Sequence, residues 1–279
     1  MSKIWKATHQ LAPPTAVEVD FERCAFLRPN AVVFLAAWKK ALEMKGVQVT
    51  LLHSTMRSNV ARSLLQNGFA AAMWGEESEP GDHAIRFRHD ESEDKEAIVD
   101  GYLKGSWLGR GWVHVSELLA NRIAGQVWEI YANAFEHGRS TVGIYSCGHH
   151  YGETAELLLA VGDLGPGVPA NVRKFLGRPM MEAKDAMHWA FSRGNSTAHS
   201  VEGADVARGL GLDLLKEFVK INGGKLEIYS HDGYAKIDTD AETYETITQC
   251  FPATIILLHL ACDEKRYVLV EELSSAPFF

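Results

Sequence analysis

The sequence predicts two folded parts, a small α/β layer over residues 1–80 and an α+β two-layer sandwich over residues 105–265. Three observations support this prediction. The first 80 residues alternate between strand-like and helix-like patterns, residues 76–100 are acidic, and a long amphipathic helix with several strands follows. A chain of 279 residues is long for one domain and comfortable for two.

Strand-like and helix-like segments alternate in the first part. The patterns predict strands over 17–21 and 47–52 and helices over 31–44 and 59–66. Pro29 suits a first helical turn, and Gly46 ends the first helix. This order and spacing favour a small layer with parallel strand pairing.

Residues 76–100 are rich in Asp and Glu. Acidic runs over 76–82 and 89–94 flank one short strand-like piece at 84–88. We interpret residues 81–104 as a solvated acidic linker; a partner-binding acidic patch is the alternative.

The second part begins with a long amphipathic helix, expected from about 113 to 137. Further helices are expected around 182–191 and over 212–222, and strands over 141–147, 155–162, 225–230, 234–238 and 254–260. Helices on one face of a mixed or antiparallel sheet form a two-layer sandwich. Residues 266–279 are expected to form a C-terminal tail.

Charge and composition narrow the function classes. The 28 basic and 36 acidic residues give a net charge of −8, which argues against a broad nucleic-acid-binding face. No apolar run is long enough for a bilayer and the first residues lack a signal-peptide pattern, so we expect a cytoplasmic protein without membrane contact. The cysteines, without a CxxC pair, indicate neither a zinc framework nor a disulfide scaffold: Cys24, Cys147, Cys250 and Cys262.

The first chemical motif lies late in the long helix. Glu129, Asn133 and His137 are spaced by four residues and therefore share one helix face. One interpretation is an ordinary solvated stripe. The functional interpretation is a carboxylate that takes a proton beside an amide oxygen that holds a hard cation such as Mg²⁺.

The second motif follows an apolar strand. Asp163 stands at the predicted strand end, where its carboxylate can accept a hydrogen bond from an amino group such as that of adenine. Gly165 and Gly167 remove side chains where the flat face of a ligand must reach the backbone. In isolation, a generic tight turn explains Asp-x-Gly equally well.

The third motif opens a helix after a polar loop over 192–197. The sequence Arg208-Gly209-Leu210-Gly211-Leu212 leads into the predicted helix, so free backbone N–H groups are offered to an anion. It is neither the GxxxxGK[ST] phosphate loop nor the dinucleotide GxGxxG pattern.

Together, in this order, the three motifs resemble the GHKL ATPase superfamily of gyrase, the large heat-shock chaperone, histidine kinases and mismatch-repair MutL. Glu129-x-x-x-Asn133 looks like its N box, Asp163-x-Gly165-x-Gly167 its G1 box and Gly209-x-Gly211-Leu212 its G2 box. The likeness covers roughly residues 105–262. It implies the Bergerat fold and the cofactors ATP and Mg²⁺.

The resemblance also implies roles for single residues. Glu129 is expected as general base, Asn133 as Mg²⁺ ligand and Asp163 as the adenine contact. The remaining nucleotide contacts that it implies are Gly165, Gly167, Asn195, Arg208, Gly209, Gly211, Leu212 and Thr254. Thr254 departs from the family pattern because Pro252 and Ala253 precede it in place of the usual glycine.

The first part resembles a STAS domain, the fold of anti-sigma-factor antagonists; the alternative is an unrelated small α/β layer. STAS domains often carry a phosphorylated Ser or Thr at a helix start, where this chain reads Arg28-Pro29-Asn30-Ala31. The missing hydroxyl leaves a docking or dimerisation role.

Two functions follow as expectations. The first is an ATPase or an ATP-dependent protein kinase, in which Glu129 activates water or a protein hydroxyl. The second is a nucleotide-gated interaction switch with little turnover. Both imply ATP as ligand and a protein partner or a homodimer.

Overall fold

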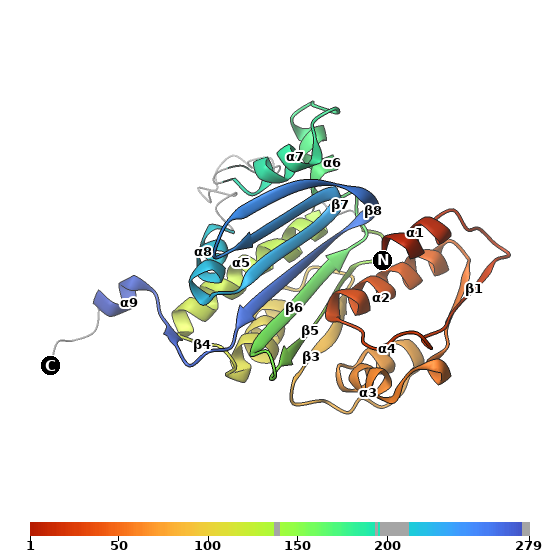
Figure 1. The fold of residues 1–279 in the computed structure, drawn as a ribbon, viewed down its shortest axis with the longest axis horizontal. Helices are drawn as coiled ribbons and strands as arrows, with labels where there is room; N and C mark the ends of the chain where they lie inside the picture. The colour runs from red at the N-terminus through yellow and green to blue at the C-terminus, as the bar shows by residue number, and fades with distance from the viewer. Residues whose placement is uncertain (137–139, 193–194, 196–211, 275–279) are drawn as a thin grey trace.

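A five-stranded antiparallel sheet is the centre of the computed structural model, which describes residues 1–136, 140–192, 195 and 212–274 (Figure 1). Its strand order is β3-β5-β6-β8-β7. The bounds are β3 (Ala84–Asp90), β5 (Ile144–Tyr151), β6 (Glu156–Asp163), β7 (Lys225–Asp238) and β8 (Glu242–Ala261). The predicted strands over 225–230 and 234–238 are one strand, interrupted by an irregularity near His231.

Helices cover the first face of the sheet. The long helix α5 (Glu117–Glu136) passes behind the strands in Figure 1, and α8 (Asp213–Asn222) contacts both α5 and β7. Side chains from this face, such as Leu157, Leu226 and Leu258, share one core with α5 and α8. The helix α5 begins at Glu117 rather than near 113, because Ser116 Oγ accepts the Leu119 N–H and caps it.

The second face of the sheet is covered as well, by the N-terminal region. Helix α2 (Pro29–Met44) contacts β5 and β6, and its side chains share a core with Leu158 and Leu257. The packing therefore crosses the boundary that the sequence predicts near residue 80, and the expected two-layer sandwich carries a further helix on its other face. The physical reason is the unbroken apolar run over 31–38, since a helix that is apolar all round is buried on more than one side.

The rest of the N-terminal region follows the predicted alternation. Strands β1 (Ala16–Val19) and β2 (Gln48–Leu51) pair in parallel, as the spacing predicts. Pro29 lies in the first turn of α2, and Gly46 follows it with φ +81°. The other segments are α1 (Ser2–Thr8), η1 (His53–Thr55), α3 (Ser58–Gln66) and α4 (Phe69–Trp74).

The expected acidic linker over 81–104 is partly folded into the sheet. Strand β3, which the sequence predicts as a short piece, pairs with β5. The π-helical segment η2 (Ala97–Trp107) follows and buries Ile98, Leu103 and Trp107 completely. These apolar side chains follow the acidic runs, and their burial explains why this stretch packs instead of remaining solvated. A short turn η3 (Leu108–Arg110) ends it.

Part of the expected tail is also ordered. Strand β9 (Arg266–Tyr267) pairs in parallel with β4 (His114–Val115), and α9 (Val270–Ser274) follows. Ser116 Oγ donates to Glu272 Oε2 at 2.6 Å, which ties α9 to the start of α5. Helices α6 (Val168–Phe175) and α7 (Ala183–Ala190) stand together at one end of the molecule (Figure 1). In the described part of the chain, every helix falls short of the length or apolar character that a bilayer span requires.

Candidate functional site

Three polar side chains form one row across the neighbouring strands β6, β8 and β7. Asp163 on β6 is paired in register with Thr254 on β8, which is paired in turn with Ser230 on β7. Each is two residues away from a side chain of the core that packs against α5: Val161, Ile256 and Ile228. All three therefore face the side of the sheet that α5 covers. Asp163 is 6 % exposed and Ser230 is fully buried. We call these three residues the polar row.

Asp163 carries the unusual electrostatics of the site. Burial raises the pKa of its carboxyl to about 7, against a hydrogen bond that lowers it: the Gly165 N–H donates to Asp163 Oδ1 at 2.6 Å. The carboxyl therefore changes its charge near neutral pH. Buried ionisable groups of this kind concentrate at functional sites.

The turn after Asp163 is fastened to the polar row. Gly167 adopts φ +84° ahead of α6, and a Cβ at this position would lie 3.0 Å from Ser230 Oγ. The Val168 N–H, in the first turn of α6, donates to Ser230 Oγ at 2.7 Å. Ser230 Oγ and Thr254 Oγ1 are 2.8 Å apart. The structure thus brings Asp163, Gly165, Gly167 and Thr254 into one neighbourhood.

Glu129 and Asn133 are exposed on α5. Gln126 lies three residues before Glu129 on the same helix face, and its Oε1 accepts the Leu215 N–H of α8 at 2.5 Å. This side of α5 is therefore turned toward the first turn of α8. Ser140, which follows α5 in the described chain, accepts the Leu164 N–H at 3.3 Å and links that end of α5 to the turn after Asp163. No hydrogen bond in the described residues joins Glu129 or Asn133 to the polar row.

The remaining predicted contacts fall around residues 193–211. Three of them lie outside the described residues: Arg208, Gly209 and Gly211. His137 of the first motif also lies outside the described residues. Asn195 Nδ2 donates to the Trp189 carbonyl at 2.9 Å. Leu212 precedes α8, is partly buried against the α5-side core, and accepts the Lys216 N–H at 2.8 Å.

A group of charged side chains, Glu242, Lys216 and Lys220, anchors α8. Glu242 binds Lys216 and Lys220, each at 2.8 Å, and Lys216 Nζ also donates to the Phe191 carbonyl at 3.0 Å. Burial alone raises the pKa of Glu242, but the hydrogen bonds from Lys216, Lys220 and Tyr244 outweigh it and lower the pKa to about 2. These charged side chains join the end of α7 and the helix α8 to the sheet.

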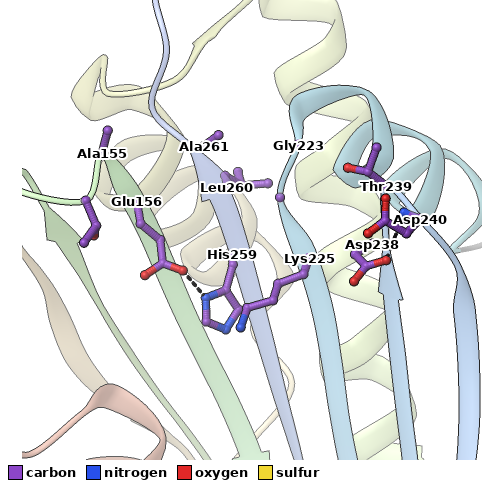
Figure 2. A pocket seen from close by; sticks show the side chains of 12 residues that line it. Ala155, Glu156, Gly223, Lys225, Asp238, Thr239, Asp240, His259, Leu260 and Ala261 are labelled. Carbon is purple, nitrogen blue, oxygen red and sulfur yellow. Dashed lines mark hydrogen bonds and ion pairs between the residues drawn. The ribbon is translucent and has the colours of Figure 1, made fainter.

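A cavity of about 440 Å³ lies away from the polar row, where β6 begins and β8 ends. Figure 2 shows His259 on its wall between Glu156 and Lys225, which come from neighbouring strands. His259 Nδ1 lies 2.5 Å from Glu156 Oε1. Because β6 runs from Glu156 to Asp163, roughly 23 Å at 3.3 Å per residue separates the cavity from the polar row, and the two do not form one site.

Few side chains that could hold a metal ion are grouped together in the described residues. In the described parts of the chain, no three His, Cys, Asp or Glu side chains are grouped so as to hold a metal ion. Mg²⁺ that is bound together with a nucleotide takes one or two protein ligands and the rest from phosphates and water. The exposed amide of Asn133 can be such a ligand.

No protein-family model matches this chain, and no curated protein matches it. The candidate site therefore rests on the residues and geometry given above.

Sequence reasoning missed Ser230 and Gln126. The signal for Ser230 was present: in the strand pattern Leu226, Ile228, Ser230, a hydroxyl occupies an inward-facing position. Gln126 gave no comparable signal, since its partner is a backbone N–H far away in the sequence.

Proposed function

We propose that this chain is an Mg-ATP-binding protein of the histidine-kinase-like ATPase type, which hydrolyses ATP or transfers its γ-phosphate to a protein in a regulatory role. The observation that carries the proposal is the buried Asp163 carboxyl, held at the end of β6 beside Thr254 and the Gly165–Gly167 turn. A buried carboxyl that titrates near pH 7 gains from a hydrogen-bond donor, and the amino group of adenine is such a donor.

The adenine base would bind at Asp163, Thr254 and the turn that follows Asp163; we call this the base end of the site. Asp163 accepts the hydrogen bond from the adenine amino group, and Thr254 lies next to it across the strand pair. Gly165 and Gly167 are buried and lack side chains, so a base bound at this turn would meet backbone and no Cβ.

The phosphate end would be formed along α5 and ahead of α8. Asn133 is exposed and supplies a protein oxygen to Mg²⁺, which when bound neutralises charge on the phosphates. Glu129, one turn earlier and also exposed, takes the proton of the attacking water or hydroxyl. The further phosphate contacts in this proposal are Asn195, Arg208, Gly209, Gly211 and Leu212.

The alternative is a nucleotide-gated interaction switch with little or no turnover. Such a switch needs no general base, so the carboxylate at Glu129 favours turnover. The STAS-like N-terminal region is, in this proposal, a regulatory docking or dimerisation surface. We place the protein in the cytoplasm.

The decisive experiment follows the label of γ-³²P-ATP with Mg²⁺ and the full chain. Free labelled phosphate establishes an ATPase, and label on the protein establishes a kinase whose acceptor can be mapped. Label that is bound but remains in ATP selects the switch. If the chain binds no ATP in a parallel titration, the proposed function is wrong.

A further inference from the structure

Ser230 is part of the polar row although no sequence motif includes it. Its side chain is fully buried on a face otherwise lined by Leu226 and Ile228. A hydroxyl buried there requires hydrogen-bond partners, and Ser230 has two, the Val168 N–H and Thr254 Oγ1. It therefore connects the first turn of α6 to the residue beside Asp163.

One of these two hydrogen bonds has a fixed direction. A backbone N–H can only donate, so Ser230 Oγ accepts from Val168. Ser230 Oγ has a second lone pair and could also accept from Thr254, but its own proton would then lack an acceptor among the described residues. We therefore take Ser230 as the donor to Thr254 Oγ1, 2.8 Å away. When Thr254 accepts this bond, its own proton remains for a third group.

We propose that Ser230 is a positioning residue for the base end of the nucleotide site, an inference that rests on the proposed function. Ser230 accepts the Val168 N–H of α6. By donating to Thr254 Oγ1 it leaves the Thr254 proton to turn away from β7, toward Asp163 on the neighbouring strand β6. The site then offers an acceptor at Asp163 next to a donor at Thr254.

This order of donor and acceptor selects between purines. Adenine presents an amino donor and, beside it, an unprotonated ring nitrogen that accepts. Hypoxanthine presents a carbonyl acceptor and a protonated ring nitrogen, which is the reverse order. The Thr254 proton therefore contributes to ATP binding and not to binding of inosine triphosphate through this edge.

The test is a titration of the full chain with ATP and with inosine triphosphate. We expect Ser230→Ala to weaken ATP binding by about three- to tenfold and to reduce the ATP preference by a similar factor. Ser230→Thr keeps the hydroxyl and is expected to keep the preference. Ser146→Ala is the matched control, a buried serine on β5 on the same side of the sheet, and leaves the preference unchanged.

Two outcomes distinguish a failure of the Ser230 inference from a failure of the proposed function. If the wild type binds ATP selectively and Ser230→Ala weakens both nucleotides by one factor, Ser230 is only structural and the inference is wrong. If the wild type binds no ATP, the proposed function is wrong and the inference falls with it. Should Ser230→Ala fail to fold, Ser230→Cys gives the same comparison, because a thiol of similar size is a weak donor and acceptor.

Discussion

Asp163 and Thr254 are register partners on β6 and β8, and both side chains face the side of the sheet that α5 covers. A carboxyl and a hydroxyl thus lie side by side where the neighbouring rows are apolar. Burial of the carboxyl costs free energy, so a ligand that donates a hydrogen bond to it is favoured. This relationship underlies the first two predictions.

Asp163→Asn is expected to weaken ATP binding by roughly 10–150-fold, because a lost hydrogen bond to a charged group corresponds to about 1.5–3 kcal/mol. Isothermal titration with Mg-ATP measures the change. Asp240→Asn, at an exposed position in the β7–β8 turn, is the control and should bind as the wild type does. An unchanged affinity for Asp163→Asn would remove this residue from the adenine site.

The affinity for ATP is expected to depend on pH through Asp163. Its pKa of about 7 means that the carboxylate which accepts the amino hydrogen bond is mostly protonated at pH 6 and mostly ionised at pH 8. Affinity should therefore fall by about tenfold from pH 8 to pH 6. Titrations of Asp163→Asn over the same range subtract the protonation of the phosphates. A pH dependence of equal size in both proteins would contradict the assignment.

Glu129→Ala is expected to bind ATP almost normally and to lose turnover by about 100-fold or more, since general-base catalysis contributes about 10²–10⁴-fold. Release of labelled phosphate under single-turnover conditions measures the rate. Glu117→Ala removes another exposed carboxylate of α5 and should retain the rate. Hydrolysis by Glu129→Ala at the wild-type rate would show that another group is the base.

Gly162→Ala is expected to destabilise the fold by about 1–3 kcal/mol through overpacking. A methyl group at Gly162 would come within 2.9 Å of Val33 Cγ1 on α2 and 3.2 Å of the Thr254 carbonyl. Urea unfolding gives the difference. Because Val33→Ala removes one of these contacts, the double variant should lose less than the sum of the two single changes. Additive losses would mean that α2 does not limit the space at Gly162.

Glu242→Gln is expected to lower the free energy of unfolding at pH 7 by about 1–2 kcal/mol, after allowance for solvent screening of a partly exposed carboxylate. The folded-state pKa of about 2 lies below the ordinary 4.5, so the stabilisation is present above pH 4.5 and is lost as pH falls through about 2. Urea unfolding at pH 7 and at pH 3 should show the two proteins converging toward acid. A constant difference would exclude the charge of Glu242 as the cause.

Much of the local structure could be predicted from the sequence. The two parallel strands, α2 with Pro29 at its start, and α3 follow the predicted order, because local periodicity and end signals determine such elements. Pairing between distant segments could not be predicted. That β3 joins the sheet beside β5 depends on contacts across more than 50 residues, which no local pattern records.

The residues of the candidate site likewise differ in how far the sequence could predict them. Asp163, Gly165 and Gly167 are local in sequence and recognisable as one turn. Ser230 enters the site only through the register of β7 with β8, and that register shifts at His231 directly after it. The roles of Glu129, Asn133 and the residues over 208–211 stay predictions.

The shared sheet also has a consequence for the order in which the chain can fold during synthesis. The core of α2 is completed by Leu158 on β6 and Leu257 on β8, which leave the ribosome long after α2 does. At about 5–20 residues per second, α2 waits roughly 10–40 s for Leu257. During that time its apolar surface is uncovered, so nascent chains of this protein are expected to depend on chaperones until the last long strand has emerged.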